Sequence, residues 1–347
     1  MSDSVLDDDG LRETDDNTPR RAAGRKKNRR ALTITLALLG VVLLLAIGVL
    51  AWYGKALNDA LNSINRSKDL LPPSETWSPP SGKAAKPGED NAPVNILIIG
   101  SDSRGADRGR SDALILAHIS GDRKSVHLIS IPRDYWVNIP GKRVAKINAA
   151  YSWGGAPLAV QTVQQLLGIH IDHVAITDFE GFKKAIDAVG GVTVYNKQAS
   201  SWGGHSWPKG EVTLATGEDA RWYVGQRYKL ANGEFDRQER QRDVTLAVFD
   251  KLTSRGVLAD PIKFREAVTA IGPSFTVDDA LTNDRITKLA MSLGFEGSSN
   301  IRSYSAPWAG FGRSVDRQSY VRVDEERLSQ LGQALRDDEM EKYYSKK

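Results

Sequence analysis

A run of 22 residues without a charge, Ala31–Trp52, constrains this chain more than any other feature of its sequence. About 20 consecutive apolar residues are enough for a helix to cross a bilayer. Directly before the run, seven positive residues and no acid lie between Arg20 and Arg30. A basic flank of this kind marks the cytoplasmic side of a membrane. The sequence therefore predicts a single-pass cell-membrane protein with a cytoplasmic N-terminus and an extracytoplasmic C-terminal domain.

A cleaved signal peptide is the alternative reading of this run. Its apolar core is usually shorter, roughly 7–15 residues, and ends at a small-residue cleavage site. Here Trp52 and Tyr53 end the run, as aromatic side chains do at a membrane interface. These two residues favour an uncleaved helix.

The net charge of +4 does not indicate a nucleic-acid partner, because the seven positive residues before the apolar run exceed it. The rest of the chain is close to neutral and shows no broad basic surface. The chain has no cysteine, which excludes disulfides and cysteine-based metal or nucleophile sites. A domain of this size can be stabilised by its core alone.

We divide the chain into four parts. Residues 1–30 read as a disordered cytoplasmic tail, 31–52 as the transmembrane helix, and 53–93 as a juxtamembrane segment with a Pro-rich linker. Residues 94–340 read as the extracytoplasmic catalytic domain. Six of the 14 prolines lie between Pro72 and Pro93, and we interpret this stretch as a spacer that lifts the domain off the membrane.

Within the domain, strand-like and helix-like segments are interspersed. Residues 94–100 are a short apolar run typical of a buried strand, and residues 113–120 and 126–131 predict a hairpin. Residues 156–169 and 178–191 have helical spacing and reach a glycine, and 236–256 predict a long helix. The fold class that follows is α/β, with a mixed central sheet sandwiched by helices.

The hairpin brings charged residues to one edge of the predicted sheet. If its turn centres on residues 122–123, Asp112 faces Arg133 at the open end. Asp102 and Arg104 follow the first strand. Two carboxylates suit a hard cation such as Mg²⁺, and arginines beside them suit phosphates. The alternative is a polar loop with solvated ion pairs.

The long helix places some of its charges on an inward face. At 100° per residue, the apolar stripe through Val244 continues to Gln241 and Arg237. Glu239 and Arg242 point to the other side and are predicted to be solvated. A buried cation needs a partner, which is either an internal carboxylate or an anionic ligand.

Histidines and tryptophans give weaker signals. The same hairpin register pairs His118 with His127, which we interpret as cross-strand neighbours and not as metal ligands. Trp153, Trp202 and Trp207 lie in Gly-rich stretches, where they either stack on sugar rings or pack against the protein. No zincin, P-loop or hydrolase-elbow motif occurs.

Six blocks in order along the chain, from "NILIIGSDSR" and "RSDALILAHI" to "GEFDRQERQRD", resemble the motifs of the LytR-CpsA-Psr family. The resemblance runs from about Val94 to Phe249. It implies an α/β sandwich with an apolar tunnel for a polyprenyl chain. It also implies a phosphotransferase that moves a glycopolymer from a polyprenyl-pyrophosphate carrier to the muramic-acid 6-hydroxyl of peptidoglycan.

The resemblance further implies partners, a cofactor and site residues. The partners are the lipid-linked glycopolymer, peptidoglycan and membrane lipid, and the cofactor is Mg²⁺ or Mn²⁺. The tunnel candidates are the apolar faces of residues 156–169 and 182–192, for which core packing is the alternative. By motif match, the metal ligands are Asp102 and Asp112; the catalytic residues are Arg133, Arg227, Arg237 and Gln241; and the substrate-binding residues are Arg104, Lys146, Arg240 and Glu234.

Two positions depart from the family pattern. Gly225 stands where the family has the first of two arginines, so that only Arg227 remains, and Glu234 replaces an aspartate. The loss at Gly225 implies a weaker phosphate grip or a substitute such as Arg104. Two alternatives to the transferase stay open, namely a lipid pyrophosphate hydrolase and a non-catalytic membrane-anchored binding or regulatory module. Candidates for the general base are Asp134, Glu234 and Asp236.

Overall fold

The computed structural model describes residues 54–55, 57–73, 92–101, 109, 111–226, 228–253, 261–293 and 300–345. The chain separates into two compact units, Met1–Gly54 and Lys55–Lys347, and every element below belongs to the second. The predicted membrane helix, Ala31–Trp52, lies outside the described residues. Within the described ranges, no helix has the length and apolar character needed to cross a bilayer.

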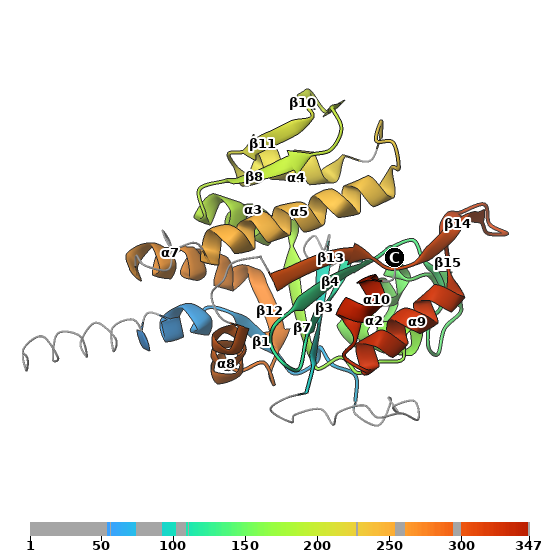
Figure 1. Ribbon diagram of the computed structural model, residues 1–347, viewed down its shortest axis with the longest axis horizontal. Helices are drawn as coiled ribbons and strands as arrows, with labels where there is room; N and C mark the ends of the chain where they lie inside the picture. Colours follow the sequence, from blue (N-terminus) through green and yellow to red (C-terminus); the bar gives the residue numbers. More distant parts are fainter. Residues whose placement is uncertain are drawn as a thin grey trace, which may run out of the picture. The chain divides into compact units, whose positions relative to one another are not determined.

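A seven-stranded sheet forms the centre of the molecule (Figure 1). Its pairings are mixed in direction: β1·β12, β7·β2 and β4·β13 are parallel, and the other three are antiparallel. The mixed sheet predicted from the hairpin is therefore confirmed. In spatial order the strands are β1 (Asn65–Ser67), β12 (Phe275–Asp278), β7 (His173–Asp178), β2 (Val94–Ser101), β3 (Ser111–Ile119), β4 (Val126–Ile131) and β13 (Ile301–Ser305).

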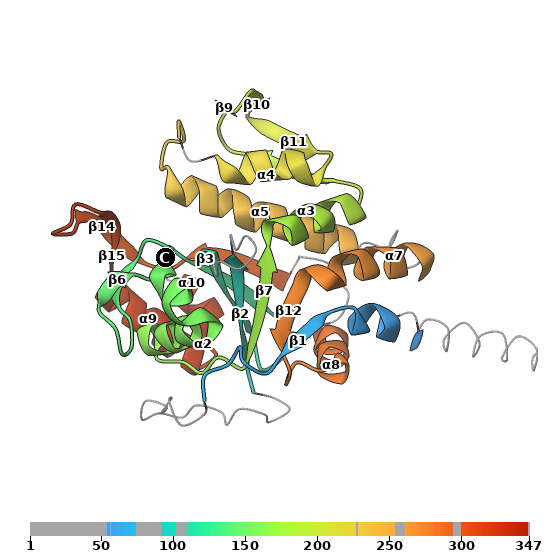
Figure 2. The same cartoon turned by 180° about the vertical axis from the view of Figure 1, so that it is seen from behind.

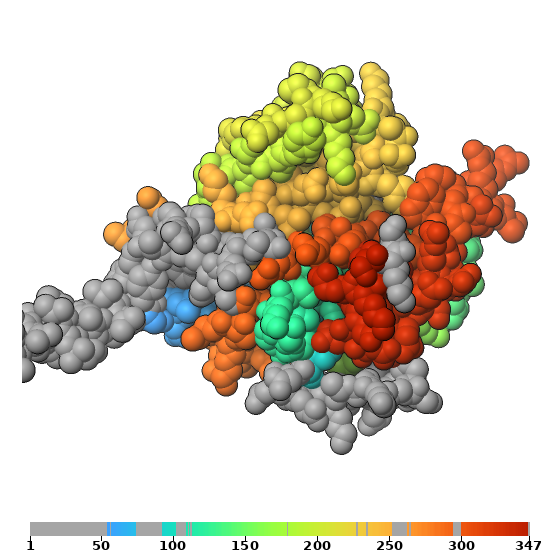
Figure 3. All heavy atoms as spheres, viewed as in Figure 1, coloured from blue at the N-terminus to red at the C-terminus, as the bar shows by residue number. Residues whose placement is uncertain are grey.

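The predicted register of the β3–β4 hairpin is also confirmed. Leu114 pairs with Ile131, and His118 pairs with His127. In the turn, Arg123 takes a left-handed conformation with φ 60°. The turn is held from outside as well, because the Gly121 amide donates to Asp338 Oδ2 at 2.8 Å. Figure 3 shows the C-terminal segment, in red, beside this turn.

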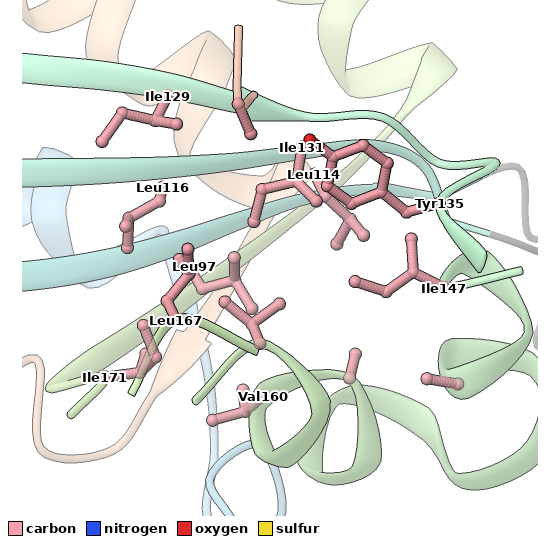
Figure 4. Close-up of a cluster of buried hydrophobic side chains, with 14 of the residues drawn as sticks. Leu97, Leu114, Leu116, Ile129, Ile131, Tyr135, Ile147, Val160, Leu167 and Ile171 are labelled. Carbon is pink, nitrogen blue, oxygen red and sulfur yellow. The ribbon is translucent and has the colours of Figure 1, made fainter. Parts of the chain in front are cut away.

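Alternation along the strands divides the sheet into two apolar faces. Leu97, Leu116 and Ile129 point to one face, where they pack with Val160 of a helix in the main core (Figure 4). Ile115 and its neighbours point to the other face. Burial in the main core is complete enough that replacing Leu116 with alanine would cost roughly 2–5 kcal/mol.

Helices cover both faces (Figure 2). The first face carries α2 (Asn148–Leu167), α9 (Glu325–Arg336) and α10 (Met340–Ser345), and the second carries α3 (Phe179–Ala188) and α5 (Glu234–Thr253). Figures 1 and 2 place α7 (Pro261–Ile271) and α8 (Asn283–Leu293) at the end of the sheet near β12 and β1. The predicted sandwich of helices around a sheet is thus confirmed.

A small sheet lies over the outer side of α5 (Figure 1). The strand that follows α3 pairs with a partner here and not in the central sheet. Trp207, Tyr223 and Val244 form the apolar cluster that joins this layer to α5. The layer consists of β8 (Val192–Asn196) with β11 (Gly210–Leu214), the hairpin of β9 (Ser200–Trp202) and β10 (His205–Trp207), and α4 (Gly217–Gly225).

Two further hairpins lie beside the sheet edge that follows β4. β5 (Trp136–Asn138) pairs with β6 (Val144–Lys146), and β14 (Trp308–Arg313) pairs with β15 (Ser319–Val323). A bridge between Tyr135 and Val321 connects the two hairpins. Stacking of Trp136 on Tyr320, with 4.7 Å between ring centroids, fastens them further.

The folded unit extends further toward the N-terminus than the predicted start at Val94. β1 pairs in parallel with β12 at the end of the central sheet. The Pro-rich stretch between Pro72 and Pro93 therefore connects two strands of one sheet. Our interpretation of that stretch as a spacer between membrane and domain is wrong, because the sheet has already begun before it.

Candidate active site

Strand ends meet at one edge of the central sheet. Ser101, the last residue of β2, pairs with Asp178 at the end of β7 and with Ser111 at the start of β3. Both serines are buried. Asp102 and Asp112 directly follow these two serines in the sequence. Because β2 and β3 are antiparallel, the chain runs in opposite directions after the two serines.

A cluster of opposite charges follows β4 at the same edge. The Lys146 Nζ lies 3.1 Å from Asp134 Oδ1, and the Arg133 Nε lies 3.9 Å from Asp134 Oδ2. All three side chains are more than three-quarters buried. The structure therefore brings together two of the predicted site residues, Arg133 and Lys146, around a carboxylate that we considered only as a candidate base.

The long helix α5 is buried on several sides. Arg237 retains only 5% of its surface exposed, which confirms the prediction that it faces inward. Arg242 is only 7% exposed, and its Nε donates to Ser303 Oγ of β13 at 2.7 Å. Our prediction that Arg242 is solvated is therefore wrong. The reason is that α5 lies between the central sheet and the small sheet, so that both of its faces are covered (Figure 1).

Arg240 is hydrogen-bonded to other side chains of the protein. Its guanidinium donates to Asn196 Oδ1 at 3.0 Å, to Ser200 Oγ at 2.7 Å and to Gln226 Oε1 at 2.8 Å. It also lies 4.2 Å from the centre of the Tyr223 ring. Burial lowers the pKa of this guanidinium. These protein groups satisfy the guanidinium within the small-sheet layer, and its role in substrate binding stays a prediction.

The start of α5 is held next to the charged edge. The Phe235 ring stacks on Trp308 of β14 with 4.1 Å between centroids. A recess of about 330 Å³ is lined by Tyr228, which precedes α5, together with Asp134 and Lys146. These contacts place the first turns of α5 beside the cluster that follows β4.

An apolar cavity of about 200 Å³ lies between the sheet and the helices of the second face. Gln241 lines it from α5, and Ser101 and Asp178 line it from the strand ends. The predicted tunnel face on α3 contributes, whereas α2 packs into the main core on the opposite face. The other apolar walls include Ile98, Ile115, Phe182, Ala185, Val224, Val248 and Phe275.

A wider polar cleft of about 720 Å³ adjoins the charged cluster, and Arg133, Asp134 and Lys146 line it. The start of α2, the β5–β6 hairpin and the β14–β15 turn form its other walls. The same edge of the sheet therefore borders an open polar cleft and, at Ser101 and Asp178, an apolar cavity.

Several predicted site residues fall outside what the structure describes. Asp102, Arg104 and Arg227 are among the undescribed residues, and the side chains of Asp112 and Glu234 are likewise undescribed. Their roles stay predictions. The backbone of Asp112 lies in β3, and Glu234 is the first residue of α5.

Gly225, the departure from the family pattern, is the last residue of α4. A Cβ built at this position would meet the Trp202 ring at 3.4 Å, which is ordinary contact. Its φ is not left-handed. Neither space nor backbone conformation therefore requires glycine here.

The histidines have structural partners, as predicted for His118 and His127. His118 Nδ1 lies 2.8 Å from Asn95 Oδ1, and His173 Nδ1 lies 3.1 Å from Asp278 Oδ1. Burial and the neighbouring His118 lower the pKa of His127 to about 4. His127 is therefore neutral at physiological pH.

Comparison with protein families decides the relationship that the motifs indicate. The model of the LytR_cpsA_psr family matches residues 56–337. The chain belongs to this family. The region that matches the LytR_cpsA_psr model starts at residue 56, well before Val94. This start agrees with the position of β1 in the central sheet.

Named relatives support the same membership. The polyisoprenyl-teichoic acid–peptidoglycan teichoic acid transferase TagU of Bacillus licheniformis is 30% identical over 91% of this chain and 98% of its own length. The crystal structure of B. subtilis TagV matches with a TM-score of 0.61 and 28% identity, covering 72% of this chain and 97% of that one. A structure of TagT bound to LIIa-WTA matches with a TM-score of 0.59 and 25% identity, covering 77% of this chain and 98% of that one.

Sequence reasoning missed some residues of this LytR_cpsA_psr site. Asp178 ends β7 at the cavity and accepts the Gly181 amide at 2.7 Å as the N-cap of α3. An aspartate directly before a helical pattern is a signal for such a cap. Phe275 lines the cavity from β12, and no local signal in the sequence places that strand near α3.

Proposed function

We propose that this chain transfers a glycopolymer from a polyprenyl-pyrophosphate carrier to peptidoglycan and leaves a phosphodiester link. The printed names of its TagU relatives describe such a reaction for those proteins. The observation that carries the proposal is the apolar cavity on the second face of the sheet. Gln241 and the ends of β2 and β7 line it, next to the charged edge. The apolar walls suit part of an isoprenoid chain, of which about 200 Å³ holds only a short stretch, and its pyrophosphate suits the cationic edge.

Phosphoryl transfer depends mainly on positioning and on neutralising charge in the transition state. In our proposal Arg133 and Arg237, with Arg227, hold the pyrophosphate, and Gln241 orients it at the mouth of the cavity. Lys146 adds a further cation and is itself fixed by Asp134 at 3.1 Å. The acceptor is the 6-hydroxyl of muramic acid.

We also propose that Mg²⁺, or Mn²⁺ in its place, is held by Asp102 and Asp112. The pairing of Ser101 with Ser111 supports this assignment, because it brings the two backbones together. Oxygen ligands of this kind suit hard cations that also bind phosphate. When bound, the cation would neutralise charge on the pyrophosphate.

For the location of the reaction, we propose a single-pass membrane protein whose N-terminus is cytoplasmic. The uncharged run Ala31–Trp52 and its basic flank support this topology. A carrier that stays in the bilayer explains why the enzyme would be anchored there.

The proposal is tested with the full-length protein in detergent, a lipid-linked donor, Mg²⁺ and soluble peptidoglycan fragments. We expect release of polyprenyl phosphate together with glycan-bearing fragments, and we expect excess EDTA to stop both. Release of polyprenyl phosphate without modified fragments would identify a hydrolase instead. Undiminished transfer in EDTA would remove the metal assignment.

One observation favours the binding or regulatory module as the second candidate. Gly225 provides no cation where the family has one, although the structure leaves room for a side chain. A module of this kind would bind the lipid-linked donor in the same assay without forming either product.

A further inference from the structure

We propose that the polar cleft beside Lys146 binds the acceptor saccharide, with Trp153 and Arg143 as its recognition wall. This inference rests on the proposed function, since it assigns the place of the second substrate. The cleft has a volume of about 720 Å³, which is ample for sugar rings. Its position, its lining and the geometry of the reaction carry the argument.

The first argument is the position of the cleft. The apolar cavity lies on the face of the sheet that carries α3 and α5. The cleft is lined by the start of α2, which packs on the opposite face. Arg133 and Lys146 line the cleft, and Ser101 and Asp178 line the cavity, so both spaces border the same edge of the sheet from its two faces.

The second argument comes from the direction of attack. In phosphoryl transfer the attacking and leaving oxygens lie roughly in line through phosphorus. If the polyprenyl chain occupies the apolar cavity, the leaving phosphate departs toward that side. The attacking hydroxyl must then arrive from the opposite side, where the cleft lies. The donor glycan, which is neither attacking nor leaving group, projects away from that line.

The third argument is the chemistry of the lining. Trp153 keeps 37% of its surface exposed, and the Arg143 guanidinium lies 5.5 Å from the centre of its ring. Amide and hydroxyl groups of Asn148, Ser152 and Gln318 line the same space. An accessible indole with neutral hydrogen-bonding groups around it matches the apolar faces and hydroxyl edges of sugars.

The carboxylates of the cleft have different surroundings. Asp316 accepts from Gln318 and Ser314 within its own turn, and these bonds lower its pKa. Asp134 also lines the cleft and lies beside Arg133 and Lys146. Of the other candidate bases, Asp236 accepts from Asn232 and Gln198.

The step that follows is balanced. The acceptor hydroxyl oxygen forms a bond to the phosphorus that carries the glycan, and its proton passes to the Asp134 carboxylate. The bond from that phosphorus to the bridging oxygen breaks. Polyprenyl phosphate leaves with the electron pair, and the glycan remains on the new phosphodiester.

The test uses Trp153→Ala and Arg143→Ala in the full-length protein, with Tyr195→Ala as the control. Tyr195 is 58% exposed on β8 in the small sheet, away from the cleft. We expect KM for the peptidoglycan fragment to rise roughly tenfold in both cleft variants, the scale of one lost aromatic contact. We expect the Kd of the lipid-linked donor, measured without acceptor, to stay unchanged.

A second measurement keeps the inference independent of catalysis. Binding of the peptidoglycan disaccharide fragment to the wild-type chain is followed by calorimetry, with Trp153→Ala alongside. Weakened fragment binding in the variant supports the acceptor site even if the wild type forms no product, which is the outcome that would defeat the proposed function. Weakened donor binding with unchanged fragment binding would assign the cleft to the donor glycan. Unchanged binding of both would overturn the inference.

Discussion

Arg237 shows how a single position reconciles burial with charge. Only 5% of its surface is exposed. It lies one helical turn before Gln241 in α5, and Gln241 lines the apolar cavity. An arginine in such a place gives charge-assisted hydrogen bonds whose strength is increased by the low local dielectric. This combination is what a pyrophosphate site requires.

We expect Arg237→Ala to lower kcat/KM for transfer by about 100-fold, because a preorganised cation opposite the developing charge is lost. The measurement is polyprenyl phosphate release under saturating Mg²⁺. Arg265→Ala, at an exposed position of α7, is the matched control and should keep wild-type activity. Wild-type kcat/KM in a folded Arg237→Ala protein would remove Arg237 from the site.

Gly225 permits the opposite experiment, a gain of charge. A Cβ there makes only ordinary contact with Trp202, and the backbone is not left-handed, so position 225 accepts a residue with a side chain without backbone strain. We expect Gly225→Arg to bind the lipid-linked donor several-fold more tightly through an added charge-assisted hydrogen bond. Gly225→Gln controls for side-chain bulk. Equal donor Kd values for the arginine and glutamine variants would show that position 225 does not face the phosphates.

At the scale of elements, α5 explains which predictions succeeded. The apolar stripe through Val244 correctly placed Arg237 inward, since stripe and period are local properties of the sequence. It failed for Arg242, because that side of α5 packs on β13 of the central sheet while Val244 packs with the small-sheet layer, and contacts between such distant segments leave no mark in the helix pattern. A helix that is covered on two sides buries residues on both, and these residues are either apolar or hydrogen-bonded. In α5 the buried Arg240 and Arg242 are hydrogen-bonded to neutral groups, so the sequence pattern does not reveal that their side is buried.

The burial of α5 also makes the stability of the protein depend on pH. Burial, followed by the neighbouring Glu239, raises the pKa of Asp243 to about 6, against the opposing influence of Arg242. A carboxyl with a raised folded-state pKa binds its proton more tightly when folded. Its contribution to stability is therefore fully present below the unfolded pKa near 3.9 and is lost as pH rises through about 6.

We therefore expect Asp243→Asn to raise Tm by a few degrees at pH 8 and to have little effect at pH 4. Thermal melts of the two proteins across this pH range measure the difference. Asp250→Asn, on the exposed last part of α5, is the control. A Tm difference that does not change with pH would contradict the raised pKa.

At the scale of the whole molecule, the central sheet acts as a partition between two substrate spaces. The sequence predicted the charged edge because hairpin register is a local property that a turn determines. It did not predict that β13 joins β4 or that β1 joins β12, since parallel pairs form between distant segments. The cleft depends on those distant pairings, as its walls come from α2, β5–β6 and β14–β15. In the sequence, the residues that line the cleft are scattered tryptophans and charged residues, and nothing in their spacing predicts that they meet.

The Pro-rich stretch gives a prediction at this scale, because it joins β1 to β2. We expect ten Gly and Ser residues inserted between Gly82 and Lys83 to leave transfer activity unchanged. A longer loop costs little, about 0.6 kcal/mol for a doubling of its length. The same insertion between Gly54 and Lys55 is the comparison. Loss of the cooperative melt on insertion at Gly82 would contradict the view that this stretch is a tolerant connection.

The early entry of β1 into the sheet sets the reach of the enzyme. Twelve residues, Tyr53–Ile64, separate the uncharged run from the first strand. Even fully extended they span at most about 40 Å, and residues 57–62 are helical, which shortens them. If the run is the membrane anchor, this short tether limits how far the folded unit can move from the bilayer. Polymer would then be attached to peptidoglycan near the membrane, within reach of a carrier that stays in the bilayer.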